Sequence, residues 1–262
     1  MKKLIFVLVV VMALVLGTIG TALAITYGEP DGDGHPYVGM YYFSDWEGDW
    51  RCSGTLISPR VFLTAGHCTY EAFNARVSFD TEITDDSKWY SGTAYAHPSY
   101  DPYWTEFPNT YDVGVVVLDK PVKMKVYGEI PDIGVLDGLD TSRGHQDLIV
   151  RTVGYGDQSI KPQEQSDLVR YTSTSMLENL RSNNNDGYNM QTSNNPSVVH
   201  GEGGACFGDS GGPVFYPADS DTVVGIVSFG MNWNCKGADW SYRVDTQDTQ
   251  DFVNAFLKTK GK

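Results

Sequence analysis

Short apolar runs separated by polar turns make up most of the chain after its first 24 residues. Runs of strand length, rich in β-branched residues, lie at 54–63, 113–118, 148–153, 214–216 and 223–229. Segments rich in Gly, Pro, Asn, Asp and Ser divide them, notably at 28–36, 98–109 and 182–197. We interpret the last segment, which is long and polar, as a surface excursion or a rim that contacts a ligand. The pattern predicts an all-β fold.

One helix is expected, at the C-terminus. Phe252, Val253, Phe256 and Leu257 recur at helical spacing, and two lysines follow them where a helix would end. The pattern therefore predicts a single amphipathic helix that packs on a β-sheet body.

The first 24 residues have the features of an export signal. Lys2 and Lys3 precede an apolar run over 4–16, and Ala22-Leu23-Ala24 has small residues at its first and third positions. An uncleaved membrane anchor is the alternative, since residues 4–25 could nearly span a bilayer. The glycines at 17–20 and the Ala-x-Ala ending favour cleavage, so residues 1–24 are predicted to be a signal peptide. The mature protein is expected to be secreted, extracellular or periplasmic.

Removal of the signal makes an acidic chain more acidic. The net charge of −14 becomes −16 over the remaining 238 residues, because two lysines leave and no acid does. This balance argues against a nucleic acid or an anionic membrane as a partner of the mature protein. The length suits one large all-β domain or two small ones, and we expect a monomer.

The cysteines are interpreted as disulfides. Cys52, Cys68, Cys206 and Cys235 allow three pairings, and the sequence leaves all three open. An oxidising compartment favours disulfides, and no Cys-x-x-Cys or Cys/His cluster has the spacing of a zinc site. No metal is expected on these thiols.

Three segments carry candidate chemistry. Phe207-Gly208-Asp209-Ser210-Gly211-Gly212-Pro213 places a potential nucleophile, Ser210, between glycines that let backbone amides approach its hydroxyl. Residues 52–58 lead into an apolar run that ends in Thr64-Ala65-Gly66-His67-Cys68, which gives His67 the context of a general base. Asp112 directly precedes a long apolar strand that could bury its carboxylate.

Together these segments resemble the chymotrypsin-like (trypsin-fold) serine endopeptidases, in the chain order His, Asp, Ser. Further landmarks are Val153-Gly154-Tyr155-Gly156, Ser228-Phe229-Gly230 and Tyr242-Arg243-Val244. The resemblance implies two packed six-stranded antiparallel β-barrels with a C-terminal helix. The barrel over 25–135 would carry His67 and Asp112, and that over 136–262 would carry Ser210 and end in the helix.

The resemblance also implies the catalytic roles. Ser210 would be the nucleophile, His67 its general base, and Asp112 the group that orients the imidazole. The backbone N–H groups of Gly208 and Ser210 would form the oxyanion hole. Substrates would be proteins or peptides, and no metal or organic cofactor is expected. A catalytically silent binding module of the same fold is the alternative, and the intact triad argues against it.

Two structural pairings follow from the resemblance. Disulfides Cys52–Cys68 and Cys206–Cys235 would brace the loop of His67 and the walls of the specificity pocket. A new α-amino group at Ile25, released by signal cleavage, would insert beside Asp209 and activate the enzyme.

Specificity is less defined by the sequence. The resemblance implies that Gly204 lies at the floor of the pocket, with Ala205 beside it, and that Ser228, Phe229 and Gly230 contact the substrate. The small Gly204 and Gly230 favour cleavage after apolar or aromatic residues. Two alternatives depend on the short segment after Cys235. Asp239 at the floor would favour Arg or Lys, and Trp240 could block the pocket.

An acidic cluster lies outside these motifs. It comprises Asp80, Glu82, Asp85 and Asp86. A calcium site is one interpretation, and a solvated acidic loop is the preferred one.

Overall fold

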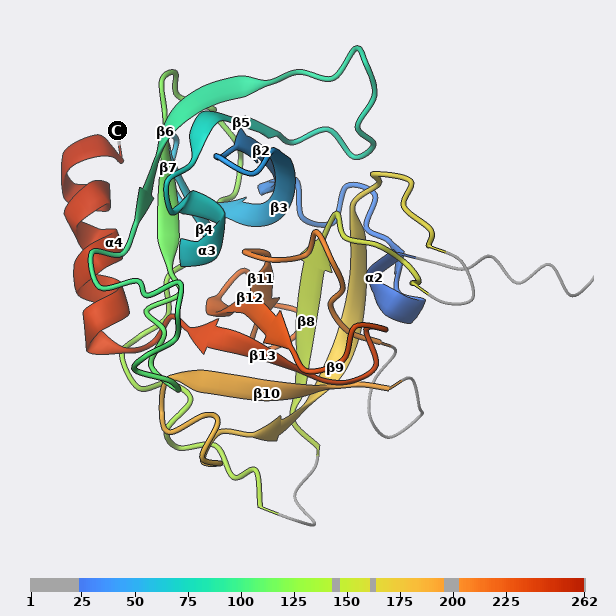
Figure 1. Cartoon of the computed structure of the whole chain (residues 1–262), viewed down its shortest axis with the longest axis vertical. Coiled ribbons are helices and arrows are strands. Elements are labelled where there is room, and N and C mark those ends of the chain that lie inside the picture. The colour runs from blue at the N-terminus through green and yellow to red at the C-terminus, as the bar shows by residue number, and fades with distance from the viewer. Residues whose placement is uncertain (1–23, 143–146, 161–163, 196–202, 262) are drawn as a thin grey trace, which may run out of the picture.

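The first barrel uses six strands in close succession along the chain. The computed structural model describes residues 24–142, 147–160, 164–195 and 203–261, so the predicted signal peptide lies outside it apart from Ala24. The strands are β2 (Val38–Ser44), β3 (Asp49–Leu56), β4 (Val61–Thr64), β5 (Phe73–Ser78), β6 (Tyr90–Ala96) and β7 (Gly114–Leu118). They close antiparallel in the order β2-β3-β4-β7-β6-β5 (Figure 1). Alternate side chains such as Leu56, Phe62 and Val116 fill its interior.

A second antiparallel barrel follows. Its strands are β8 (Ile149–Gly154), β9 (Tyr171–Asn179), β10 (Asn189–Asn194), β11 (Pro213–Phe215), β12 (Val223–Gly230) and β13 (Gly237–Arg243). The order is β9-β10-β13-β12-β11-β8, closed by pairing of β8 with β9, and the short β1 (Glu29–Pro30) extends the β9 edge. The architecture is the predicted pair of six-stranded barrels.

Two details of the sequence prediction were wrong. The apolar run at 54–63 is not one strand, because residues 57–60, which include Pro59, form the turn between β3 and β4. The segment 182–197 is not only a loop, because it contains β10. Asn189 and Asn194 of β10 are fully buried, and the Asn194 side chain donates to the carbonyl of Ala205 at 2.8 Å. These buried amide side chains are stabilised by hydrogen bonds, so a search for apolar residues does not detect the strand.

The predicted C-terminal helix is α4 (Gln247–Lys260), which begins at an N-cap threonine, Thr246. It leaves the second barrel and packs against the first, as Figure 1 shows at its left edge. Phe256 contacts the ring of Tyr95, and Phe252 that of His97, each pair with ring centres about 5 Å apart. The helix therefore ties the two barrels together. No helix in the described ranges is both long and apolar enough for a membrane span.

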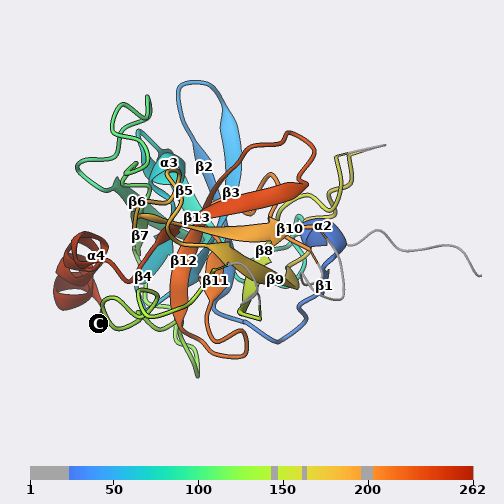
Figure 2. The same ribbon diagram turned by 90° about the horizontal axis from the view of Figure 1, so that it is seen from below.

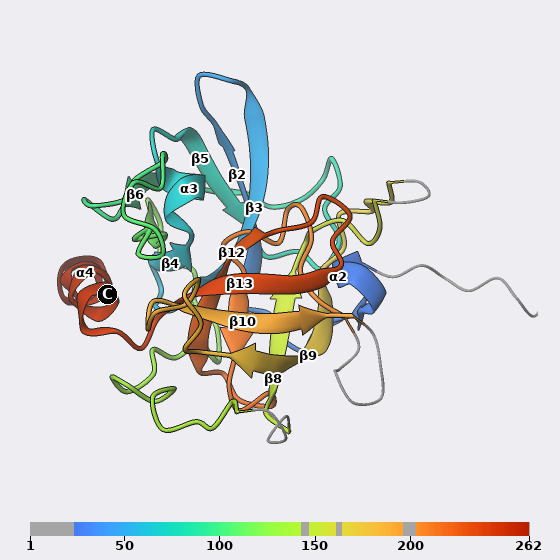
Figure 3. The ribbon, with the colours of Figure 1, turned by 60° about the horizontal axis from the view of Figure 1, so that its bottom comes forward.

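Two four-residue helical segments remain, and in the first of them Ile25 and Thr26 have non-helical backbone angles. One is α2 (Ala24–Tyr27), beside β9, and the other is α3 (Gly66–Thr69), which follows β4. In Figure 1, α3 lies at the rim of the first barrel directly above β11 and β12. Figures 2 and 3 show the β2–β3 hairpin projecting beyond that barrel, so β3 runs from an exposed tip down to the junction.

Candidate active site

His67 and Asp112 meet because of strand pairing in the first barrel. β4 pairs with β7 so that Thr64 lies opposite Gly114, and the two functional residues lie just beyond that register. Nδ1 of His67 is 2.9 Å from Oδ2 and 3.1 Å from Oδ1 of Asp112. The backbone N–H of His67 also donates to Oδ1, at 2.7 Å. These contacts fix the imidazole and leave its Nε2 directed away from the carboxylate.

The charges of this pair stabilise each other. Burial alone would raise the pKa of Asp112, but the charge of His67 and the hydrogen bonds that Asp112 accepts hold it below its ordinary value. Burial alone would lower the pKa of His67, but Asp112 outweighs burial and the pKa is raised above 6.5. Asp112 is therefore ionised when His67 is neutral and able to accept a proton.

Ser228 is the residue whose role the sequence missed. It was expected to contact substrate, and it does line the pocket, but its hydroxyl also donates to Oδ2 of Asp112 at 2.5 Å. The donor comes from β12, so the second barrel helps to hold the carboxylate of the first. No signal in the sequence joins residues 116 positions apart.

Ser210 lies on a loop pressed against the end of β4. Its carbonyl accepts the N–H of Ser53 at 2.8 Å. A Cβ on Gly211 would overlap the hydroxyl of Thr64, so only glycine lets the loop approach this closely. The loop thus reaches Ala65, two residues before His67. No hydrogen bond joins Ser210 Oγ to His67 in the described chain. Such contacts commonly tighten only with substrate bound.

The expected oxyanion-hole donors are free. Within the described residues, neither the N–H of Gly208 nor that of Ser210 donates to a protein acceptor, and both residues are partly exposed. Gly208 has φ +96°, a conformation that favours glycine. Two donors are therefore available beside the hydroxyl of Ser210.

Asp209 is buried on the far side of this loop. It accepts the N–H of Gly156 at 2.8 Å and that of Cys206 at 2.9 Å. Burial raises its pKa to about 7, although both hydrogen bonds oppose the shift. No cationic group of the described residues pairs with it. Ile25, its expected partner, is fully buried against Tyr171, and its nitrogen is part of the peptide bond with Ala24.

The structure forms both disulfides that the resemblance implies. Cys52–Cys68 joins β3 to α3, and Cys206–Cys235 joins the Ser210 loop to the segment before β13. The first disulfide holds α3, which contains His67, and the second holds one wall of the pocket beside Ser210.

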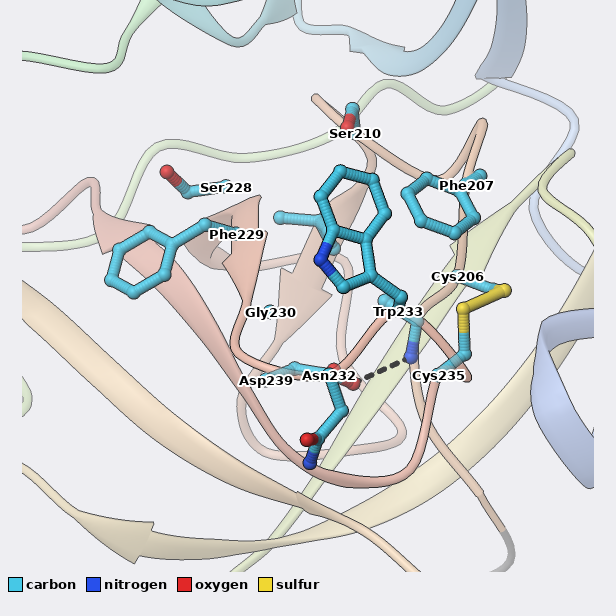
Figure 4. A pocket seen from close by; sticks show the side chains of 12 residues that line it. Cys206, Phe207, Ser210, Ser228, Phe229, Gly230, Asn232, Trp233, Cys235 and Asp239 are labelled. Carbon is cyan, nitrogen blue, oxygen red and sulfur yellow. Dashed lines mark hydrogen bonds between the residues drawn. A yellow bond between two sulfur atoms is a disulfide. The ribbon is translucent and has the colours of Figure 1, made fainter. Parts of the chain in front are cut away.

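A cavity of about 240 Å³ opens beside Ser210 (Figure 4). Ser228, Phe229 and Gly230 form one side of it. Phe207 and Trp233 stack on each other with ring centres 5.9 Å apart, and in Figure 4 they stand on the Ser210 side of the cavity. The further lining residues are Ala205, Cys206, Val227, Asn232, Cys235 and Asp239.

Gly204 does not line this cavity, and the expectation that it forms the floor was wrong. A Cβ on Gly204 would lie 2.5 Å from Oδ2 of Asp239 and from Cγ of Asn194. The absence of a side chain at 204 therefore makes room for the Asp239 carboxylate rather than for a substrate. Trp240 does not line the cavity either, since it stacks on Phe229 with ring centres 5.4 Å apart.

Asp239 supplies the charge at the base of the cavity. It is 7% exposed, and its Oδ2 accepts the N–H of Ala205 at 2.7 Å (Figure 4). Burial raises its pKa to about 7, and the hydrogen bonds from Asn194 and Ala205 oppose the shift. No basic residue lines the cavity in the described chain. Among the residues that the structure describes, this buried carboxylate therefore has no counter-ion.

The acidic cluster at 80–86 does not assemble as a site. In the parts of the chain that the structure describes, the one tight group of potential ligands is Cys52, His67 and Cys68, whose thiols are joined in the disulfide. Asp80 instead accepts the N–H of Lys88 at 2.8 Å.

Fold and site together define a chymotrypsin-like serine protease architecture. The trypsin family model matches residues 27–252, and the chain belongs to the trypsin family. It is 29% identical over 195 residues to brachyurin of Leptuca pugilator, covering 71% of this chain and 78% of that protein.

Solved structures share the fold. The HL collagenase structure aligns with a TM-score of 0.67 at 17% identity, over 86% of this chain and 95% of that one. An inactivated protease paralogue of the scabies mite, S-I1, aligns with a TM-score of 0.64 at 18% identity, over 89% and 99%. The fold therefore occurs with and without catalysis.

Proposed function

We propose that this protein is a secreted serine endopeptidase that hydrolyses peptide bonds through Ser210, His67 and Asp112. The observation that carries the proposal is the hydrogen bonding of Asp112 to both the ring and the backbone of His67. The loop of Ser210 reaches Ala65, two residues before this oriented imidazole. The inactive relative of the same fold makes loss of catalysis the second candidate.

In the proposed mechanism each of these residues has a defined role. Ser210 Oγ attacks the scissile carbonyl carbon while Nε2 of His67 takes its proton. The N–H groups of Gly208 and Ser210 stabilise the oxyanion, and Asp112 stabilises the imidazolium. His67 then protonates the leaving amine, and an ester remains on Ser210. A water molecule, activated by His67, hydrolyses this ester in the reverse sequence of proton transfers.

Because of Asp239, peptides with Arg or Lys before the scissile bond are the favoured substrates. A buried carboxylate without a counter-ion gains most from a cationic side chain, and the aromatic rings at the cavity mouth can pack on its methylene stem. This reverses the preference expected from Gly204, because the glycine accommodates Asp239. Peptides with an apolar or aromatic residue at this position are cut more slowly, and they are cut fastest when Asp239 is protonated.

The pH dependence of turnover tests the triad. Because Asp112 raises the pKa of His67 in the free protein, kcat/KM should rise with pH to a midpoint above 6.5. The measurement is steady-state hydrolysis of a peptide amide from pH 5 to 9, with the Ser210→Ala protein as the baseline. A rate independent of pH across this range would contradict His67 as the base.

Activation is proposed to require cleavage between Ala24 and Ile25. The released α-amino group would move to Asp209 and supply the counter-ion that this buried carboxylate lacks. We expect the protein that begins at Ile25 to be at least ~100-fold more active than one carrying an extra alanine before Ile25. N-terminal sequencing of the secreted active protein checks the site, and full activity from any other N-terminus would overturn it.

A further inference from the structure

An ion pair joins the two barrels beside the proposed oxyanion hole. Arg51 of β3 pairs through Nη2 with the carboxylate of Asp157, which follows β8 in the second barrel. The same Nη2 donates to Ser166 Oγ at 2.7 Å. Asp157 is 3% exposed, whereas the Arg51 side chain is 29% exposed. The triad does not use either residue.

This pair contacts the peptide that carries one oxyanion donor. The N–H of Asp157 donates to the carbonyl of Phe207 at 2.8 Å. In a trans peptide the carbonyl of Phe207 and the N–H of Gly208 point in opposite directions, so holding the carbonyl fixes the direction of the N–H. Ser53 Oγ holds the next carbonyl, that of Gly208, at 2.9 Å.

Arg51 also lies directly against Gly208. A Cβ on Gly208 would be only 2.8 Å from Nε of Arg51, so the guanidinium packs against the glycine itself. Glycine allows the Phe207–Gly208 peptide to rotate more readily than any other residue would. A rotated peptide would direct the Gly208 N–H away from the substrate. Something must therefore hold this peptide in one orientation.

We propose that the Arg51–Asp157 ion pair is a positioning device that holds the Phe207–Gly208 peptide with its N–H directed at the reacting carbonyl. The inference rests on the proposed function, because an oxyanion hole has meaning only in an acyl-transfer enzyme. Without Arg51, the buried Asp157 carboxylate is left unpaired and its segment is no longer anchored to β3.

The test compares Arg51→Gln and Asp157→Asn with Arg151→Gln in the processed protein. Arg151 is the control for loss of an arginine charge, because it pairs with an exposed aspartate, Asp219, and contacts neither Gly208 nor the triad. Loss of one oxyanion donor costs about 10²–10³ in kcat, so partial misplacement should lower kcat about 10- to 100-fold. We expect KM within about twofold of wild type, and affinity for a peptide boronate inhibitor to fall in parallel with kcat.

Each other outcome decides against the proposal. Unchanged kcat in both variants would overturn it, and so would a raised KM with unchanged kcat, which would make Arg51 a substrate-binding residue. If thermal stability falls while kcat per titrated active site stays at the wild-type value, the pair has a structural role only. If wild-type protein neither hydrolyses peptides nor reacts at Ser210 with a phosphonate probe, the proposed function itself has failed instead.

Discussion

Replacing Ser210 by alanine should lower kcat/KM for peptide amides by at least ~10⁴-fold. In serine proteases the loss of one triad member removes most catalysis because the members act as a unit. Folding should be unaffected, because the hydroxyl makes no hydrogen bond in the described chain and the backbone bond from Ser53 to the Ser210 carbonyl is retained. Steady-state kinetics and thermal unfolding of the purified variant check both parts.

The result has a clear control. His67→Ala should lose activity to a similar degree, and the double variant should lose little more than either single variant. Substantial activity in Ser210→Ala would reject Ser210 as the nucleophile. A catalytically silent wild type with the same fold and stability would instead support the binding-module alternative.

Replacing Asp239 by asparagine should change which bonds are cut. Removing one partner of a buried charge pair costs about 2–5 kcal/mol, so kcat/KM for substrates with Arg or Lys before the scissile bond should fall about 30- to 5,000-fold. Asparagine has nearly the same shape and can still accept the N–H of Ala205. Substrates with Phe or Tyr should therefore be cut at rates within a few-fold of wild type.

The pH dependence of preference gives an independent measure of Asp239. Its carboxylate is charged above its pKa of about 7, so the ratio of kcat/KM for Arg over Phe substrates should rise between pH 5.5 and 8.5. Taking the ratio cancels the titration of His67, which affects both substrates. In Asp239→Asn the ratio should be flat, while the exposed control Asp219→Asn should behave as wild type. A native ratio that is flat or favours Phe throughout would contradict the assignment of Asp239.

The sequence predicted those parts of the molecule that depend on local signals. The glycines around Ser210 and the apolar strand after Asp112 can each be recognised from a short segment of sequence. The family resemblance rests on these segments. The paired barrels followed from that resemblance.

What it missed depends on contacts between distant segments. Ser228 bonds to Asp112 across the junction of the barrels, and the buried side chains of β10 are polar except for Met190. The interpretation of Gly204 failed for the same reason: its meaning depends on the side chain of Asp239, 35 residues later, which fills the space beside it. The residue type at one position suggests a role, but the role also depends on which side chain packs against it in the folded protein.

The central claim is that Ser210 is an activated nucleophile, and covalent labelling tests it most directly. Processed protein is treated with a fluorophosphonate, digested, and mapped by mass spectrometry, with Ser210→Ala as the blank. We predict one adduct per molecule, on Ser210, and loss of peptide hydrolysis in proportion to labelling. Two results would contradict the account. In one, folded protein that begins at Ile25 is not labelled. In the other, the reagent labels a different residue and abolishes hydrolysis while Ser210 stays unmodified.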